Sequence, residues 1–217
     1  MDEHELAEKI KNKQASYEDV FRWCEENIDS VDFSNSDQIS VYDSAIRFMM
    51  NGRITQLTEN EATVMIKYLS KSYLNEKGLN DRVTVNVLDW KKFLKIHKSD
   101  KLNAMCSTLK DTKFILDYSP NVIKGLMSGD SNKFMDALKT IYHETAHVIQ
   151  ESSIALSEIN GKKVNYTASM YEIALENTAR KADPKFYDEN YENLLLENQA
   201  NKVRIDKGVF SNFKICT

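Results

Sequence analysis

Residues 134–150 read Phe-Met-Asp-Ala-Leu-Lys-Thr-Ile-Tyr-His-Glu-Thr-Ala-His-Val-Ile-Gln. Apolar side chains recur in this stretch at helical intervals, which predicts a helix with one side packed on a core. The apolar positions are Phe134, Leu138, Ile141, Val148 and Ile149. At about 100° per residue, His143 and His147 fall on the side opposite this apolar stripe. They face either solvent or a cleft that another part of the chain closes.

The spacing of the two histidines indicates a specific chemistry. His143 and His147 are at positions i and i+4, so a helix presents both imidazoles on one face, about one turn apart. Two imidazole nitrogens in this arrangement supply two of the ligands of a zinc ion. Glu144 follows the first histidine directly, where its carboxylate can take a proton from a water that the metal activates. A solvated helix face that carries two histidines by chance is the alternative interpretation.

The composition of the whole chain limits the classes of protein to which it can belong. Its 217 residues suffice for one large domain, or for a catalytic domain with a helical extension. The net charge of −4 is mild and no block of basic residues occurs, so we expect no nucleic-acid partner. The three cysteines are far apart and odd in number, which argues against a disulfide framework and favours a reducing compartment.

Neither a signal peptide nor a membrane span is expected. The first five residues are acidic and lack the apolar segment of a secretory signal, which favours a cytoplasmic protein. Export by a route that needs no such signal is also compatible with the sequence. No apolar run approaches the roughly 20 residues that cross a bilayer.

Most of the chain before the motif is expected to be helical, since the sequence contains only two prolines and six glycines. One helix is expected to begin near Ser16. Apolar residues recur at helical spacing over residues 37–50, and this pattern stops at Gly52. A capping box of Thr58 and Glu61 opens a third helix.

Two segments depart from the helical pattern. Residues 83–88 alternate apolar and polar side chains over a β-branched run, which predicts a strand. Residues 113–118 form a second candidate strand, stopped by Pro120. We therefore expect a predominantly helical α+β fold with a small sheet packed beside the motif helix. Residues 1–55 are expected to be an N-terminal helical extension packed on the core, and residues 57–217 a catalytic domain.

The third ligand must come from elsewhere in the chain, since catalytic zinc commonly has three protein ligands and an open fourth position. Five carboxylates after the motif qualify by charge: Glu158, Glu172, Glu176, Glu192 and Glu197. Glu197 is preferred, because Ala200 leaves room for close packing on the motif helix and Asn201 can hydrogen-bond a ligand histidine. Glu176 is the second choice. It places the cation of Arg180 at the equivalent position, which suits a zinc site poorly.

These residues resemble the gluzincin metallopeptidases, in which a helix bearing His-Glu-x-x-His is followed by a second helix that supplies a glutamate. The resemblance covers roughly residues 57–205. His143, Glu144, His147 and Glu197 match the ligand and base positions of that family. The resemblance implies a zincin-like fold, a Zn²⁺ cofactor and hydrolysis of a peptide or protein substrate.

Two further stretches are similar to small bacterial minigluzincin domains. One is the extended form His-Glu-x-x-His-x-x-Gln that ends at Gln150, and the other is the stretch 186–197. The chain departs from the family at Asn201, where many gluzincins carry an acidic residue. This departure bears on how strongly a ligand histidine is polarised.

The resemblance also implies a mechanism. Zinc polarises the scissile carbonyl, and Glu144 takes the proton of the attacking water and passes it to the leaving amine. Tyr187 and Tyr191 are candidate donors to the developing oxyanion. The main alternative is a non-catalytic zinc-binding helical interaction protein with a structural site. A second alternative is a helical partner-binding protein without metal.

Overall fold

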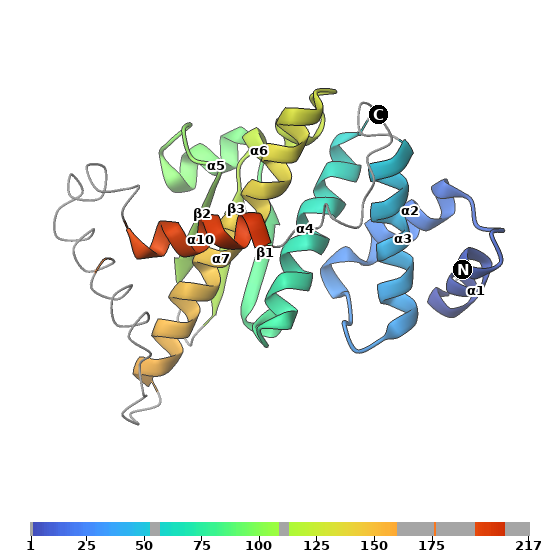
Figure 1. Cartoon of the computed structure of the whole chain (residues 1–217), viewed down its shortest axis with the longest axis horizontal. Helices are drawn as coiled ribbons and strands as arrows, with labels where there is room; N and C mark the ends of the chain where they lie inside the picture. The colour runs from blue at the N-terminus through green and yellow to red at the C-terminus, as the bar shows by residue number, and fades with distance from the viewer. Residues whose placement is uncertain (1, 53–56, 109–112, 160–175, 177–193, 207–217) are drawn as a thin grey trace.

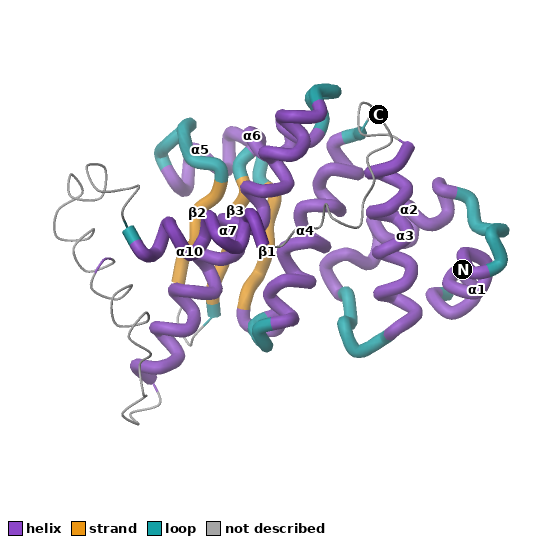
Figure 2. Tube along the Cα trace, viewed as in Figure 1, coloured by secondary structure: helices purple, strands orange, loops and turns teal. Residues whose placement is uncertain are grey.

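Helices make up most of the molecule, and a three-stranded sheet lies among them (Figures 1 and 2). The structure is a computed structural model, and it describes residues 2–52, 57–108, 113–159, 176 and 194–206. The α-helices are α1 (Glu3–Lys11), α2 (Tyr17–Asn27), α3 (Ser36–Gly52), α4 (Glu59–Glu76), α5 (Trp90–His97), α6 (Pro120–Leu126), α7 (Ser131–Ile159) and α10 (Leu195–Asp206). Two short 3₁₀ helices, η1 (Ile28–Ser30) and η2 (Asn80–Arg82), precede α3 and the sheet. The predicted α+β class with a small sheet is confirmed.

The three helices predicted before the motif are present, and local capping explains where two of them begin. The Ser16 side chain accepts a hydrogen bond from the Asp19 amide at the start of α2. Thr58 and Glu61 form both bonds of the predicted capping box at the start of α4. The described part of α3 extends to Gly52, where the apolar pattern stops.

The sheet consists of β1 (Val83–Val87), β2 (Ala104–Thr108) and β3 (Phe114–Tyr118), in the order β1-β3-β2. β3 is central. It runs parallel to β1 and antiparallel to β2, with Leu116 opposite Val85 and Cys106. β1 and β3 are the two predicted strands. β2 is an additional edge strand, and its sequence Ala-Met-Cys-Ser-Thr lacks the β-branched alternation that marks β1.

α5 and α6 are further elements that the sequence did not predict. Pro120 was expected only to stop a strand, but it occupies the first turn of α6 with Ser119 as the N-cap residue. Proline suits that position because a backbone N–H in the first turn of a helix has no partner within the helix, so proline loses no hydrogen bond by lacking one. The end of α5 is held to the sheet by His97, whose Nε2 lies 2.9 Å from Oδ2 of the buried Asp117.

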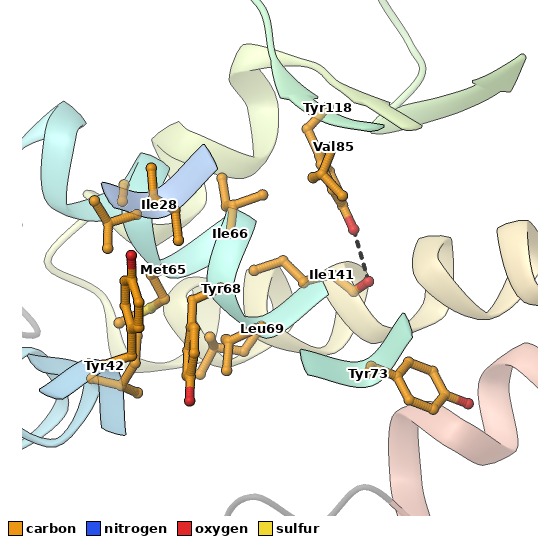
Figure 3. Close-up of a cluster of buried hydrophobic side chains, with 14 of the residues drawn as sticks. Ile28, Tyr42, Met65, Ile66, Tyr68, Leu69, Tyr73, Val85, Tyr118 and Ile141 are labelled. Carbon is orange, nitrogen blue, oxygen red and sulfur yellow. Dashed lines mark hydrogen bonds between the residues drawn. The ribbon is translucent and has the colours of Figure 1, made fainter. Parts of the chain in front are cut away.

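The N-terminal helices share a hydrophobic core with the rest of the molecule. One cluster of buried side chains extends from Leu6 in α1 to Ala200 in α10. At the boundary between α3 and α4, the rings of Tyr42 and Tyr68 stack with centroids 4.8 Å apart (Figure 3). α2 and α3 therefore pack against α4, and α1 packs on α3. The division into residues 1–55 and 57–217 stays a prediction. No helix in the described ranges is long and apolar enough to cross a bilayer.

Candidate metal centre

A buried polar cluster fixes the orientation of α7, the helix that carries the motif. The Tyr118 hydroxyl, from β3, donates a hydrogen bond to the Ile141 carbonyl at 2.9 Å (Figure 3). It also lies 3.0 Å from the hydroxyls of Ser70 in α4 and Thr145 in α7. Thr145 is the third residue of the His-Glu-x-x-His motif and is fully buried. Because Thr145 faces the sheet and α4, the two histidines of the motif are turned to another side of the helix.

α10 crosses α7 (Figure 1), and its residue Glu197 lies 3.4 Å from both histidines of the motif. Ala200 is fully buried, and its small side chain lets the two helices approach closely, as its spacing from Glu197 predicted. Glu197 lies in the first turn of α10, and its side chain is 1% exposed. A carboxylate so fully removed from water needs nearby positive charge or hydrogen-bond donors. His143 and His147 of α7 lie close enough to Glu197 to supply that charge or those donors.

The three side chains bring one ligand atom each to a common point. Nε2 of His143 and Nε2 of His147 are 3.0 Å apart. Oε2 of Glu197 lies 3.4 Å from both nitrogens. Ligand atoms about 2.0–2.1 Å from a tetrahedral zinc ion are about 3.3–3.4 Å from one another. Two edges of this triangle match that spacing, and the edge between the histidines is slightly shorter.

Gln150 selects the tautomer of one of the histidines. Nδ1 of His147 lies 3.0 Å from Oε1 of Gln150, so the ring donates its Nδ1–H to the amide oxygen. This tautomer leaves the lone pair of Nε2 available for a metal. The Gln150 amide nitrogen in turn donates to Oε1 of Gln199 in α10, at 3.4 Å. Gln150 thus connects the candidate ligand to the helix that covers it.

The hydrogen bond expected from Asn201 to a ligand histidine is not formed. Nδ1 of His143 is buried and has no hydrogen-bond partner among the described residues, and Nδ1 of His147 is bound by Gln150. The sequence analysis missed Gln150 in this role. The available signal was its position three residues after His147, which places both side chains on one helix face.

Burial and charge perturb the ionisable groups of the site in the metal-free protein. Burial is the main cause that raises the pKa of Glu144. The two histidines lower that pKa, and Glu197 adds to the rise. For His147, burial alone would lower the pKa, but the hydrogen bond and charge of Glu197, with Glu144, leave it raised. A glutamate with a raised pKa binds a proton more readily near neutral pH, which suits a general base.

The structure also distinguishes among the candidate glutamates. Among the described residues, the group whose ligand atoms converge is His143, His147 and Glu197, and Glu176 is not part of it. Glu158 lies in α7, but its side chain is outside the description. The remaining candidates, Glu172 and Glu192 as ligands and Tyr187 and Tyr191 as oxyanion donors, lie outside the described residues.

Comparisons with known proteins give no assignment. No family model, curated protein or solved structure matches the chain. The chemistry of the converging side chains is therefore the basis for proposing a function.

Proposed function

We propose that this chain is a zinc-dependent metallopeptidase in which His143, His147 and Glu197 hold the metal. The observation that carries the proposal is the convergence of two imidazole nitrogens and one buried carboxylate oxygen with edges of 3.0, 3.4 and 3.4 Å. The residues come from two helices separated by 50 positions along the chain, between His147 and Glu197. Chance histidines on a solvated helix face do not account for a buried carboxylate at the same point.

The set of donor atoms favours zinc over the common alternatives. Imidazole suits zinc, copper, iron and nickel, whereas magnesium and calcium prefer oxygen ligands alone. Two histidines with one glutamate form a three-ligand set of the kind found at catalytic zinc sites. The side chains of His143 and His147 are 12% and 17% exposed, so water retains access to the side of the site that they form.

The placement of the elements supports a zincin-like arrangement. The motif helix α7 lies beside a small sheet, and α10 brings the glutamate to its histidine face (Figures 1 and 2). This order of motif helix followed by glutamate helix is the one that the gluzincin resemblance implies. The polar cluster around Thr145 holds α7 against the sheet, so its histidines are carried on a fixed surface.

Glu144 is the general base of the proposed reaction. A zinc ion held by His143, His147 and Glu197 would supply a Lewis acid for the scissile carbonyl and would increase the acidity of a water. Glu144 follows a ligand histidine directly, accepts the proton of the attacking water and delivers it to the leaving amine nitrogen. The substrate of the reaction is a peptide or protein.

A cleavage assay with a matched pair of variants tests the proposal. The zinc-loaded chain is incubated with a diverse peptide mixture, and new termini are identified by mass spectrometry. We expect the wild type to cleave, and Glu144→Gln to bind zinc but lose about 10²- to 10⁴-fold in rate, because only the base is removed. Asp136→Asn, which removes a carboxylate elsewhere on α7, should cleave like the wild type.

Two outcomes would contradict the proposed reaction. If the wild type binds zinc but cleaves no peptide in the mixture, the site is structural, and the non-catalytic zinc-binding alternative holds. If Glu144→Gln cleaves as fast as the wild type, Glu144 is not the base.

A further inference from the structure

α5 lies at the edge of the molecule, remote from the N-terminal helices, and carries an unusual concentration of positive charge (Figure 1). Its sequence is Trp-Lys-Lys-Phe-Leu-Lys-Ile-His, and Lys98 and Lys101 follow it. Residues 89–101 contain five lysines and two aspartates, which leaves an excess of three positive charges on a chain whose net charge is −4. This part of the surface is therefore opposite in sign to the molecule as a whole and attracts anions.

The buried side of α5 determines which of its residues face solvent. Phe93 is fully buried, and His97, one turn later, contacts the buried Asp117 of β3. At about 100° per residue, Lys91 and Lys95 point away from the side that carries Phe93 and His97. Both lysines are exposed. The contacts to the sheet thus fix the helix with its cationic side outward.

Most of these lysines have no partner in the described parts of the chain. The exception is Lys92, whose ammonium lies 3.5 Å from Oδ2 of Asp89. The side chains of Lys91, Lys95, Lys98 and Lys101 form no ion pair or hydrogen bond with any described residue. These four ammonium groups are therefore available to an external ligand.

Large apolar side chains are exposed among the lysines. Leu94 and Ile96 of α5 are 41% and 56% exposed, and Met105 of β2 is 38% exposed. Met105 is directly opposite Asp117 in the sheet, so it lies on the same face of the sheet as α5. These are three of the five large hydrophobic side chains that are exposed within the described ranges. Such clustering distinguishes an interaction surface from apolar residues scattered singly.

Trp90 adds an aromatic ring beside this cluster. It precedes Leu94 by one turn, so the two side chains lie on the same flank of α5. The ammonium of Lys124, from α6, lies over the Trp90 ring at 5.6 Å from its centroid. A tryptophan beside lysines is typical of protein segments that lie at the interface between a bilayer and water.

The residue types favour an anionic lipid bilayer over a protein or a nucleic acid. Residues 89–101 contain no arginine. Arginine predominates where a protein or a phosphate is bound in a fixed geometry, whereas the flexible ammonium of lysine suits a diffuse anionic surface. A nucleic-acid backbone attracts lysines but has no place for exposed aliphatic side chains. The headgroup region of a bilayer accommodates both kinds of side chain.

We propose that α5, with the residues that follow it and Met105, docks on the surface of an anionic lipid bilayer. The lysine ammonium groups contact the lipid headgroups, and Trp90 and Leu94 enter the interfacial layer. Each lysine near such a surface increases the partition onto it about fivefold, so four free lysines suffice for reversible binding. This docking surface contains none of the candidate metal ligands and is independent of the proposed hydrolysis.

Vesicle binding by the full chain tests the proposal. One set of vesicles is phosphatidylcholine alone, and the other contains about 30 mol% phosphatidylserine. We expect at least about tenfold tighter binding to the anionic vesicles in co-sedimentation, and a loss of most of this difference when salt is raised from about 0.1 M to about 0.5 M. Trp23 is buried in the core, so a blue shift of tryptophan emission on binding reports on Trp90, the second of the two tryptophans.

Two variants separate the contributions of charge and apolar contact. Lys91→Glu combined with Lys95→Glu should weaken binding to the anionic vesicles at least about tenfold. Lys13→Glu combined with Lys77→Glu is the matched control, since it changes the net charge equally at exposed positions outside α5. Leu94→Ser should weaken binding about fivefold, because its side chain no longer enters the interfacial layer.

Several outcomes would overturn the proposal. Equal binding to the two kinds of vesicle, or no binding to either, rules out docking on anionic lipid. Wild-type binding by the α5 charge variant, or equal weakening by its control, places the contact elsewhere. If the variants do not fold, the comparison of the two vesicles and the Trp90 emission of the wild type decide. Displacement from the vesicles by an oligonucleotide, with no effect of Leu94→Ser, identifies a polyanion site instead.

Discussion

Nδ1 of His147 lies 3.0 Å from Oε1 of Gln150, one turn further along α7. This hydrogen bond holds the proton on Nδ1 and so presents the lone pair of Nε2 to the candidate metal position. Gln150 therefore contacts the candidate metal site through His147 and is not itself one of the candidate ligands.

Replacing Gln150 tests this indirect role. Gln150→Ala leaves Nδ1 of His147 without its acceptor, so zinc affinity should fall about 10- to 100-fold, measured by competition with a chelator. Gln150→Glu keeps an acceptor at the same place and should restore affinity. Gln199→Ala, which removes only the bond between Gln150 and α10, should have a smaller effect. Wild-type affinity in Gln150→Ala would show that the bond does not orient the ligand.

The polar cluster beneath the motif should contribute measurably to stability. Tyr118→Phe removes the hydroxyl that connects Ser70, Ile141 and Thr145, and leaves the buried Ser70 hydroxyl without its partner, while Thr145 still donates to the Ile141 carbonyl. We expect the free energy of unfolding in urea to fall by about 1–3 kcal/mol. Tyr142→Phe is the matched control, because the Tyr142 hydroxyl makes no hydrogen bond within the described parts of the chain. If the two variants lose the same free energy of unfolding, the hydrogen bonds of the Tyr118 hydroxyl do not contribute to stability.

The contact between α1 and α3 should depend on pH. Nδ1 of His4 lies 2.8 Å from Oδ2 of Asp37, and this hydrogen bond is the main cause that raises the pKa of His4 above 6.5. A raised folded-state pKa gives a stabilisation that is complete below pH 6.5 and is lost as the pH rises through the folded-state value. His4→Asn should therefore destabilise the protein more at pH 5.5 than at pH 8.5, measured by urea unfolding. A difference that does not vary with pH would contradict this assignment.

Local signals explain which parts of the fold could be predicted. The capping box of Thr58 and Glu61 and the β-branched run of β1 each lie within a few consecutive residues, and both are present in the structure. Local sequence patterns also allowed the candidate site to be proposed from the sequence. The spacing of His143 and His147 defines a helix face, and the small Ala200 beside Glu197 indicates a close helix contact.

Other parts depend on contacts between residues far apart in the chain. β2 is a strand because Cys106 and its neighbours pair with β3, and its own sequence carries little strand preference. Likewise, the structure does not place Asn201 on Nδ1 of either candidate ligand histidine. Whether Asn201 reaches α7 depends on how α10 is rotated against α7, which the sequence pattern does not define.

The zinc content of the purified chain tests the central claim most directly. After incubation with zinc and removal of excess metal, elemental analysis should give about one equivalent per chain for the wild type and for Glu176→Ala. Glu197→Ala should retain much less, because it loses the carboxylate that lies 3.4 Å from both histidine nitrogens. A wild-type chain that takes up no zinc would contradict the metal site. Full retention in Glu197→Ala with loss in Glu176→Ala would contradict the assignment of the third ligand.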